Sequence, residues 1–220
     1  MTELNFERAR YNMIEQQVRP WEVLDERILD VVQHTPREDF VPRAYRNLAF
    51  ADLQIPLGHD EVMMEPRLEA RLLQSLNPQP NEEALEIGTG SGYLTACLSR
   101  LAAHVTSIEI HEDFRDGAQA SLTRLGVRNA DLATGDAARG WDDGRRYDVI
   151  AVTGSLPELH EGFHRSLTIG GRLFLIVGEG PVMEGLLITR VAEDYWATDS
   201  LFDTSIRPLV NAPTTRRFSL

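Results

Sequence analysis

The stretch ALEIGTGSGYLT, residues 84–95, decides how this chain is expected to fold. A short apolar run at 84–87 ends in a glycine-rich turn, and the turn opens directly into a helical pattern. Gly88, Gly90 and Gly92 tolerate positive φ and let backbone N–H groups approach a ligand closely. Dinucleotide-binding proteins carry G-x-G-x-x-G, whereas the spacing here is G-x-G-x-G, which argues against a pyrophosphate. The turn predicts a ligand site at the end of a strand.

Strand-like and helical patterns alternate along the rest of the chain. Nearly continuous apolar runs predict strands at 84–87, 104–110, 130–134, 147–153 and 172–177. Helical spacing predicts helices near 91–102, 112–125 and 156–167. This order predicts an α/β fold with a doubly wound, mostly parallel, Rossmann-like sheet covered by helices on both faces. Two further runs, 186–191 and 205–210, are candidates for late strands.

The first 80 residues have a different pattern. Helices are expected at 5–18, at 25–35 with Asp25 as N-cap, and at 66–76 with Pro66 in the first turn. Prolines and glycine make 35–42 and 51–60 loop-like. We therefore expect residues 1–80 to form a helical and loop cap, and residues 81–220 to form the ligand-binding core of the same domain.

Composition limits the classes of function. The chain has 220 residues, 42% of them apolar, and a formal net charge of −12, which argues against a broad surface for nucleic acid or anionic membrane. The single Cys97 excludes an intramolecular disulfide and a cysteine-rich metal site, and no metal site is predicted. The N-terminal sequence lacks an apolar signal core, and no run is long enough to span a bilayer. We expect a cytoplasmic protein, and the sequence leaves its oligomeric state open.

Three acidic residues stand at the ends of successive predicted strands. Glu86 lies directly before the glycine turn and suits a cationic amine. Glu109 follows Gly88 by 21 positions, where doubly wound nucleotide folds place the carboxylate that holds ribose hydroxyls. We expect Asp136, in TGDA, to accept a hydrogen bond from the exocyclic amine of adenine. An adenosine with a cationic tail and no phosphates fits best, which indicates S-adenosylmethionine.

The segment LEIGTGSGYLTACLSRL, followed by VTSIEI, resembles the cofactor-binding region of class I S-adenosylmethionine-dependent methyltransferases. More narrowly, the chain resembles the protein-L-isoaspartate O-methyltransferase family over most of its length. The segments that carry this resemblance, in family order, are MIEQQV, DERILDVVQHTPREDFVP, AFADLQIPLGH, TGDAARGW, YDVIAVTGS, GGRLFLIVG and IRPLV. The front half is the more diagnostic part, because many unrelated methyltransferases share the glycine loop. The resemblance implies methyl transfer from S-adenosylmethionine to isoaspartyl residues of a protein or peptide substrate.

The resemblance also implies roles for single residues. Cofactor contacts are expected at Glu86, Ile87, Gly88, Thr89, Gly90, Gly92, Glu109, Ile110, Asp136 and Ala137. His59 is expected near the active site, as a candidate catalytic residue. Trp141 is expected to pack near the adenine loop, and Asp148 to support the entry of a strand.

The chain departs from the family at residues 58–66, GHDEVMMEP, where family members typically read G-H-G-Q-T-I-S-x-P. Val62 stands at the position of the threonine and Met64 at that of the serine, which is placed at the substrate carboxylate. Neither side chain donates a hydrogen bond, so we do not expect Met64 itself to act in the reaction. Asp60 and Glu61 replace glycine and glutamine, and they would repel an anionic substrate if they faced the pocket. At least one of Met63 and Met64 is expected to fill core space.

Three hypotheses follow from an intact cofactor half and an altered substrate loop. The first is an active protein-L-isoaspartate O-methyltransferase that tolerates the loop. The second is a methyltransferase of the same fold with a different substrate, neutral or cationic. The third is a catalytically silent relative that binds the cofactor and acts as a sensor or partner module. A dehydrogenase is disfavoured by the glycine spacing.

Overall fold

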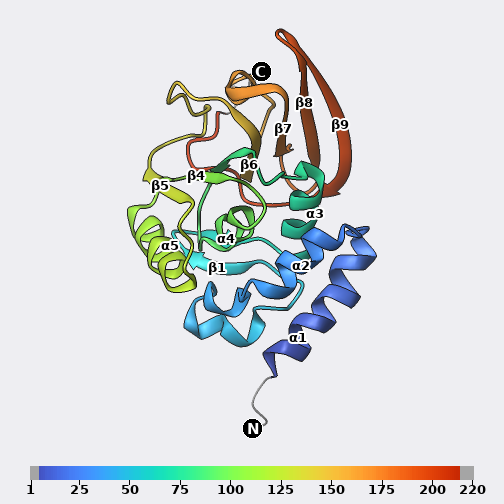
Figure 1. The fold of residues 1–220 in the computed structure, drawn as a ribbon, viewed down its shortest axis with the longest axis vertical. Helices are drawn as coiled ribbons and strands as arrows, with labels where there is room; N and C mark the ends of the chain where they lie inside the picture. The colour runs from blue at the N-terminus through green and yellow to red at the C-terminus, as the bar shows by residue number, and fades with distance from the viewer. Residues whose placement is uncertain (1–4, 214–220) are drawn as a thin grey trace, which may run out of the picture.

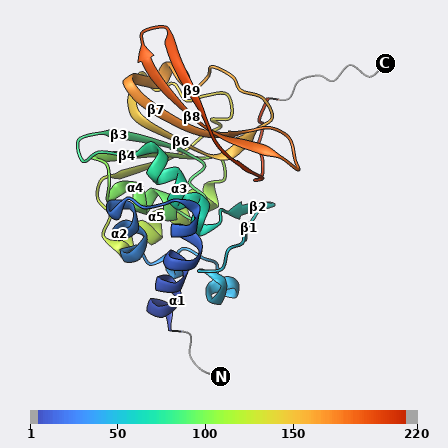
Figure 2. The same ribbon diagram turned by 90° about the vertical axis from the view of Figure 1, so that its right-hand side faces the viewer.

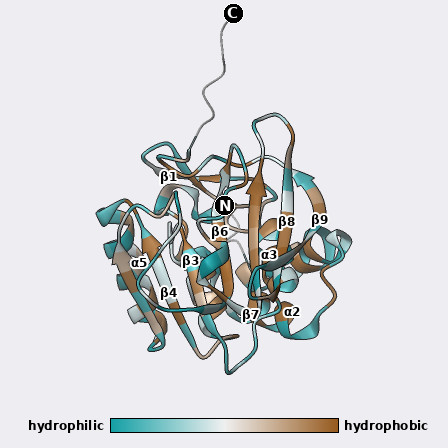
Figure 3. Ribbon diagram, turned by 90° about the horizontal axis from the view of Figure 1, so that it is seen from above, coloured by the Kyte–Doolittle hydropathy of each residue, from teal (hydrophilic) through white to brown (hydrophobic). Residues whose placement is uncertain are grey.

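A seven-stranded sheet forms the centre of the protein, for which a computed structural model describes residues 5–213. The strands lie in the order β5-β4-β3-β6-β7-β8-β9 (Figure 1). Their bounds are β3 Glu83–Ile87, β4 His104–Glu109, β5 Ala130–Thr134, β6 Tyr147–Leu156, β7 Leu167–Val177, β8 Met183–Ala192 and β9 Tyr195–Thr204. Each of the five strands predicted from nearly continuous apolar runs is present, and the second half of β7 is strongly apolar (Figure 3).

The first five strands of the sheet run parallel. β3 pairs in parallel with both β4 and β6. The chain therefore adds β4 and β5 on one side of β3 and then returns to add β6 and β7 on the other side. Ligands of open α/β sheets bind at such a reversal, outside the carboxyl ends of the strands. Asp148 supports the entry to β3, as expected, because its carboxylate accepts hydrogen bonds from Glu83 N–H (3.0 Å) and Thr168 Oγ1 (2.7 Å). The mostly parallel sheet is confirmed.

The late part of the sheet differs from the prediction in one strand. The run 186–191 is confirmed as part of β8, which pairs antiparallel with β7. The run 205–210 is not a strand of the sheet and makes only an isolated bridge, Ser155 with Pro208. The seventh strand is β9, which was not predicted because it is a half-exposed edge strand without a continuous apolar run.

Helical segments make up most of the front of the chain, and three more lie among the strands of the sheet. In the front they are α1 Phe6–Met13, η1 Ile14–Val18 (a π-helix), η2 Arg19–Trp21, α2 Glu26–His34, η3 Arg37–Asp39, η4 Arg43–Leu48 and α3 Pro66–Leu76. The later ones are α4 Tyr93–Ser99, α5 Glu112–Leu125 and η5 His164–Ser166. Asp25 caps α2 as predicted, because its side chain accepts a hydrogen bond from Arg27 N–H at 2.8 Å. Pro66 is the first residue of α3, also as predicted.

The predicted helix at 156–167 is wrong. Strand β6 continues through Leu156, and only the short η5 follows before β7 begins. Pro157 interrupts the helical pattern, and Gly162 packs so closely on the Arg139 carbonyl that no Cβ fits there. His160 Nε2 lies 3.0 Å from the Ala138 carbonyl oxygen and fixes the same contact. A tertiary contact therefore determines the course of this segment.

The two faces of the sheet are covered differently. One hydrophobic cluster joins alternate strand residues, such as Val105 and Val149, to α2, α3, α4 and α5 (Figure 2). The other cluster includes Ile150 and Phe163, with Trp141 packed against it from a loop. Helices were expected on both faces, but the second face is covered by loops and η5 in the part of the chain that the structure describes.

A small hairpin, β1 Ile55–Gly58 and β2 Glu61–Met63, occupies part of a segment that was expected to be a loop. His59 and Asp60 form its turn with φ values of 49° and 61°, a left-handed pair that suits a tight hairpin. The hairpin leads through Met64 into α3, and Ile55 and Met63 belong to the same hydrophobic cluster as the helices. It extends beside the end of the sheet where the glycine loop lies (Figure 2).

Candidate functional site

An open cavity, of about 730 Å³ when the solvent space at its mouth is included, lies at the carboxyl ends of β3, β4, β5 and β6. The hairpin and the segment 206–210 complete its wall. The lining residues are Leu57, Glu61, Val62, Met64, Ile87, Gly88, Gly90, Ile108, Glu109, Ile110, His111, Phe114, Gly135, Asp136, Ala137, Ala138, Thr153, Gly154, Ile206, Arg207, Pro208, Leu209 and Val210. This is the ligand end of the sheet expected from the strand order.

Most of the site residues expected from the sequence meet in this cavity. The ones that line it are Met64, Ile87, Gly88, Gly90, Glu109, Ile110, Asp136 and Ala137. His59, Glu86, Thr89 and Gly92 do not line it. Thr89 is buried behind the loop, where its hydroxyl lies 2.5 Å from Ser107 Oγ.

The glycine loop forms the floor of the cavity. Gly88, Gly90 and Gly92 all have positive φ, at 93°, 52° and 85°. A Cβ at Gly88 would overlap Thr153 Oγ1, so only glycine lets the loop close on β6. A Cβ at Gly92 would lie 2.9 Å from the Ala118 Cβ, so this glycine lets α4 pack on α5.

Glu86 is fully buried beneath the glycine loop. Its Oε2 accepts hydrogen bonds from Ser107 Oγ (2.6 Å) and Thr95 Oγ1, while Oε1 has no partner among the described residues. Burial raises the pKa of this carboxyl from 4.5 to about 8, although both hydroxyls lower it. Glu86 lines a second, smaller cavity, which shares Met64 and Gly88 with the first. An unpaired carboxylate oxygen thus stands beside the ligand cavity.

Glu109 fixes the loop from the neighbouring strand. Its Oε2 accepts a hydrogen bond from Gly90 N–H (2.8 Å), and its Oε1 accepts one from His111 N–H (3.0 Å). It is 4% exposed and lines the cavity. The carboxylate therefore connects the glycine loop to the end of β4.

Asp136 lies at the far side of the cavity, after β5. Its Oδ1 accepts a hydrogen bond from Ala138 N–H (3.0 Å), and its Oδ2 accepts one from Asn211 Nδ2 (2.9 Å). Trp141 packs against Gly135, close enough to leave no room for a Cβ there. Trp141 thus packs beside the loop that holds Asp136, as expected.

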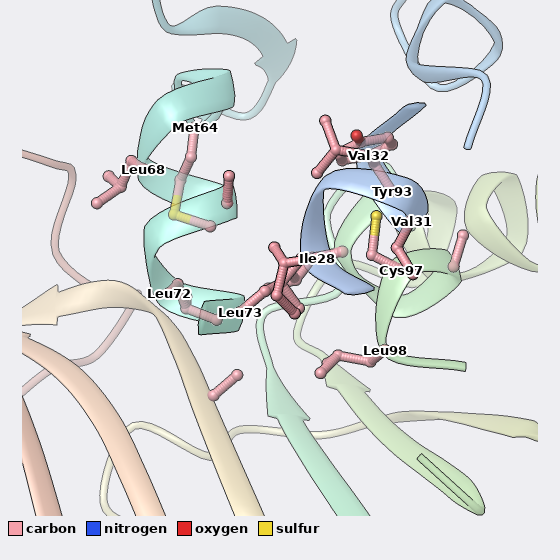
Figure 4. Packing of buried hydrophobic residues seen from close by; sticks show 14 of the residues in the cluster. Ile28, Val31, Val32, Met64, Leu68, Leu72, Leu73, Tyr93, Cys97 and Leu98 are labelled. Atoms are coloured by element: carbon pink, nitrogen blue, oxygen red, sulfur yellow. The ribbon is translucent and has the colours of Figure 1, made fainter. Parts of the chain in front are cut away.

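The hairpin side of the cavity is apolar. Val62 is half-buried, and Met63 and Met64 are 4% and 6% exposed, so both methionines fill core space. Figure 4 shows the Met64 side chain beside α3, near Leu68. Of the two acids in this loop, Glu61 lines the cavity, whereas Asp60 is exposed and lies outside the lining.

His59 stands outside the cavity at the hairpin turn. Its Nε2 lies 3.0 Å from Asp113, and its ring stacks on His111 with centroids 4.2 Å apart. The hydrogen bond from His59 lowers the pKa of Asp113. His111 lines the cavity, so His59 reaches the site only through a neighbour. This geometry supports a role in holding the hairpin to α5, in place of direct contact with a substrate.

Two basic lining residues were not expected from the sequence, His111 and Arg207. His111 follows Glu109 by two positions, and the polar ligand contact at this strand end was expected from the acid alone. Arg207 lies in the run IRPLV, which was interpreted as a strand. Within residues 5–213, no three His, Cys, Asp or Glu side chains are grouped to hold a metal ion, and no helix there is long and apolar enough to cross a membrane.

Comparisons with known proteins agree with this geometry. The sequence model of the protein-L-isoaspartate(D-aspartate) O-methyltransferases matches residues 8–212. Protein-L-isoaspartate O-methyltransferase 1 of Rhodopseudomonas palustris (strain HaA2) is 36% identical over 207 residues, which cover 94% of this chain and 84% of that protein. Protein-L-isoaspartate O-methyltransferase 2 of Pelobacter propionicus is 34% identical over 209 residues, with coverage of 94% and 93%. A Plasmodium falciparum β-aspartate methyltransferase, crystallised with S-adenosyl-L-homocysteine, superposes with a TM-score of 0.78 at 20% identity, over 94% of this chain and 99% of that one, and shares the fold.

Proposed function

Since this chain belongs to the protein-L-isoaspartate(D-aspartate) O-methyltransferase family, we propose that it transfers a methyl group from S-adenosylmethionine to the carboxylate of isoaspartyl residues in damaged proteins. One observation of the structure carries the proposal. Glu109 and Asp136 line one cavity floored by the glycine loop, and Glu86 lies beneath that loop in an adjoining smaller cavity that shares Met64 and Gly88 with the first. The arrangement supports cofactor binding, which all three hypotheses share, and the family match over residues 8–212 favours the first of them, an active enzyme of the family.

The residues present fit S-adenosylmethionine. Glu86 offers a buried, unpartnered carboxylate oxygen to a cationic amine, and the backbone of Gly88 and Gly90 lines the adjoining cavity. Glu109 is placed to accept hydrogen bonds from ribose hydroxyls, and Asp136 from the adenine amine. Ile87, Ile110 and Ala137 would supply apolar contacts, while Thr89 and Gly92 support the loop from behind. When bound, the cofactor supplies a methyl group activated by a positively charged sulfur.

The chain itself supplies position and a dry environment. A carboxylate acceptor needs no general base, so the main task of the residues is to orient it and exclude water. Val62 and Met64 form an apolar wall on the substrate side. Arg37 donates a hydrogen bond from Nη2 to the Met64 carbonyl oxygen (2.6 Å) and fixes that wall to the core.

Calorimetric titration with S-adenosylmethionine, followed by methyl transfer to an isoaspartyl peptide, tests the proposal. We expect binding, and turnover of the isoaspartyl peptide well above that of its aspartyl counterpart. Absence of binding at millimolar ligand would overturn the proposed function. Binding without turnover would favour the catalytically silent alternative, and turnover of another acceptor class would favour the second.

Replacing Glu109 with alanine should weaken cofactor binding about tenfold to a hundredfold, because hydrogen bonds to a charged group contribute about 1.5–3 kcal/mol each. Calorimetry measures the effect. Glu109→Gln keeps an acceptor for Gly90 N–H and separates loop order from ribose binding. Glu112→Ala, at an exposed position early in α5, is the matched control and should leave affinity unchanged. Equal affinities for the Glu109 and Glu112 variants would contradict the assignment.

Val62→Thr is expected to raise kcat/KM for an isoaspartyl peptide about tenfold, since it adds a hydroxyl donor to the apolar wall at nearly constant volume. Met64→Ser is the poorer probe, because Met64 is 6% exposed and its loss would open a core cavity. Val127→Thr, in the turn after α5, is the control. No difference between the two threonine variants would show that the missing hydroxyl does not limit turnover.

We also propose that residues 1–80 act as a cap within the same domain. Their support is a hydrophobic cluster that unites Met13 and Ile28 from the front with Val105 and Val149 from the sheet. A cytoplasmic location belongs to the same proposal and is supported by the free, buried thiol of Cys97.

A further inference from the structure

The cavity contains one guanidinium, that of Arg207, among its described lining residues. Arg207 is exposed to solvent, and no hydrogen bond or ion pair occupies its guanidinium in the described part of the chain. The charged residues that share the cavity are His111 and the acids Glu61, Glu109 and Asp136. Glu109 and Asp136 are already held by backbone N–H groups. Arg207 is therefore a cation without a partner at the mouth of the site.

The backbone of Arg207 is held in a defined place. Ser155 N–H donates a hydrogen bond to the Arg207 carbonyl oxygen (2.8 Å), and Leu209 N–H donates one to the Ser155 carbonyl oxygen (2.9 Å). These bonds attach the segment 206–210 to the end of β6, on the side of the sheet away from β4 and β5. Glu109 ends β4, two strands away from β6, and we therefore assign Arg207 to the substrate end of the cavity.

Glu61 opposes Arg207 from the hairpin. It is half-buried in the same cavity, and burial raises the pKa of its carboxyl, while the charges of His111 and Arg207 lower it. Arg207 thus lies within electrostatic range of Glu61, although the two form no ion pair within 4 Å. A carboxylate that enters this space meets the attraction of Arg207 and the repulsion of Glu61.

We propose that Arg207 binds the methyl-accepting carboxylate and that Glu61 competes with that carboxylate for Arg207. The inference rests on the proposed function and deepens it. The apolar wall of Val62 and Met64 offers no hydroxyl donor, and the Thr153 hydroxyl already donates to the Ile87 and Gly88 carbonyl oxygens. A guanidinium, with its fork of N–H donors, is the side chain best suited to hold a carboxylate there.

The arrangement also explains how substrate and product are distinguished. The acceptor carries a negative charge before methylation, and its ester carries none. Arg207 therefore attracts the substrate and not the product, and the repulsion between Glu61 and the acceptor ends once the ester has formed. Glu61 then acts as a specificity-determining residue, because it disfavours further negative charge near the acceptor.

The test measures binding of a fluorescent isoaspartyl peptide to the full-length protein saturated with S-adenosylhomocysteine, by anisotropy. Arg207→Gln should raise the dissociation constant about tenfold to a hundredfold, and Arg207→Lys should restore part of the loss. Glu61→Gln should lower it several-fold. Arg128→Gln makes the same charge change just before β5, at the opposite end of the sheet, and should leave it within twofold. The methyl-ester form of the peptide should bind all variants alike.

The outcomes separate the inference from the proposed function. If the wild type prefers the isoaspartyl peptide over its aspartyl counterpart but Arg207→Gln matches Arg128→Gln, the Arg207 assignment is overturned and the proposed function stands. If the wild type binds S-adenosylmethionine yet shows no preference between the peptides, the proposed function fails, and the Arg207 assignment fails with it. An equal effect of Arg207→Gln on the carboxylate and the ester also overturns the assignment. Calorimetry should show unchanged cofactor affinity in Arg207→Gln.

Discussion

Replacing Arg37 with methionine is expected to lower the free energy of unfolding by about 3–5 kcal/mol, because this is the usual cost of removing one partner of a buried ion pair. For a domain of this length, that loss corresponds to a fall in melting temperature of roughly 10 °C. Urea and thermal unfolding measure it directly. Among the single substitutions proposed for this protein, this one is expected to have the largest effect on stability.

The contacts of Arg37 explain the size of the effect. The side chain is 1% exposed and pairs with Glu69 of α3, while it donates hydrogen bonds to the carbonyl oxygens of Ala49 (2.7 Å) and Met64 (2.6 Å). Its guanidinium carbon lies 4.8 Å from the centre of the Tyr93 ring. Methionine matches the length of the side chain but leaves a carboxyl and two carbonyls without a donor.

The pH dependence of this effect has a definite sign. Burial raises the pKa of Glu69 above 4.5, and Arg37 opposes that rise. A carboxyl with a raised folded pKa contributes most to stability below its unfolded value, and the contribution is lost as pH rises through the folded pKa. Without Arg37 the folded pKa rises further, so the loss extends to higher pH. The difference between the wild type and Arg37→Met should therefore be smaller at pH 5 than at pH 9.

Two variants control for trivial causes. Arg43→Met changes an exposed arginine in η4 and should alter stability by about 0.5 kcal/mol or less. Arg37→Met combined with Glu69→Met removes both charges and should recover part of the loss. If Arg37→Met were no less stable than Arg43→Met, the pair would not be a structural support of the hairpin wall.

The sequence predicted the sheet because its central strands are buried on both faces. β3, β4, β6 and β7 contain nearly continuous apolar runs, and such runs can be recognised without knowledge of the neighbouring strands. β9 was not predicted because it is an edge strand with one exposed face, and its sequence mixes Trp196 and Phe202 with Asp199 and Asp203. The β1–β2 hairpin escaped because its strands have only four and three residues. The helix at 156–167 failed because Gly162 packs on Arg139, a contact between distant parts of the chain.

The residues of the site also differ in whether the sequence alone could predict them. Glu109 and Asp136 were predicted because parallel strands bring their carboxyl ends to one edge, so position along the chain implies position in space. Arg207 was missed because its place depends on the hydrogen bonds between Ser155 and the segment 206–210, which no local pattern records. The sequence singled out Glu86 as a candidate but did not indicate its burial, in which the hydroxyls of Thr95 and Ser107 satisfy one carboxylate oxygen.

Glu86→Gln is expected to weaken S-adenosylmethionine binding about a hundredfold, since truncating one member of a buried charge pair costs about 2–5 kcal/mol. The same substitution should stabilise the cofactor-free protein at pH 9. Glutamine keeps the shape of the side chain and can accept from Ser107, but it carries no charge to desolvate. Opposite effects on affinity and on stability would be hard to produce by simple misfolding.

The sign follows from the pKa of Glu86, which burial raises from 4.5 to about 8. Below pH 4.5 the carboxyl is protonated in both the folded and the unfolded protein, and it imposes no penalty. From pH 4.5 to about 8 the folded protein retains a proton that the unfolded chain has released, so stability falls as pH rises. Glu86→Gln has no such proton, and its stability relative to the wild type should increase across that window.

Cofactor binding should reverse this protonation. A cationic amine beside Glu86 favours the carboxylate, so binding releases close to one proton, and affinity should rise almost tenfold per pH unit between pH 6 and 7.5. Titration calorimetry in buffers of different ionisation enthalpy counts that proton, and Glu86→Gln should release none. Glu69, the other buried carboxyl of the smaller cavity, is already paired with Arg37 and should release none on binding. A wild type that binds without proton release would place the amine elsewhere. Unchanged affinity in Glu86→Gln would show that the buried oxygen serves the fold alone.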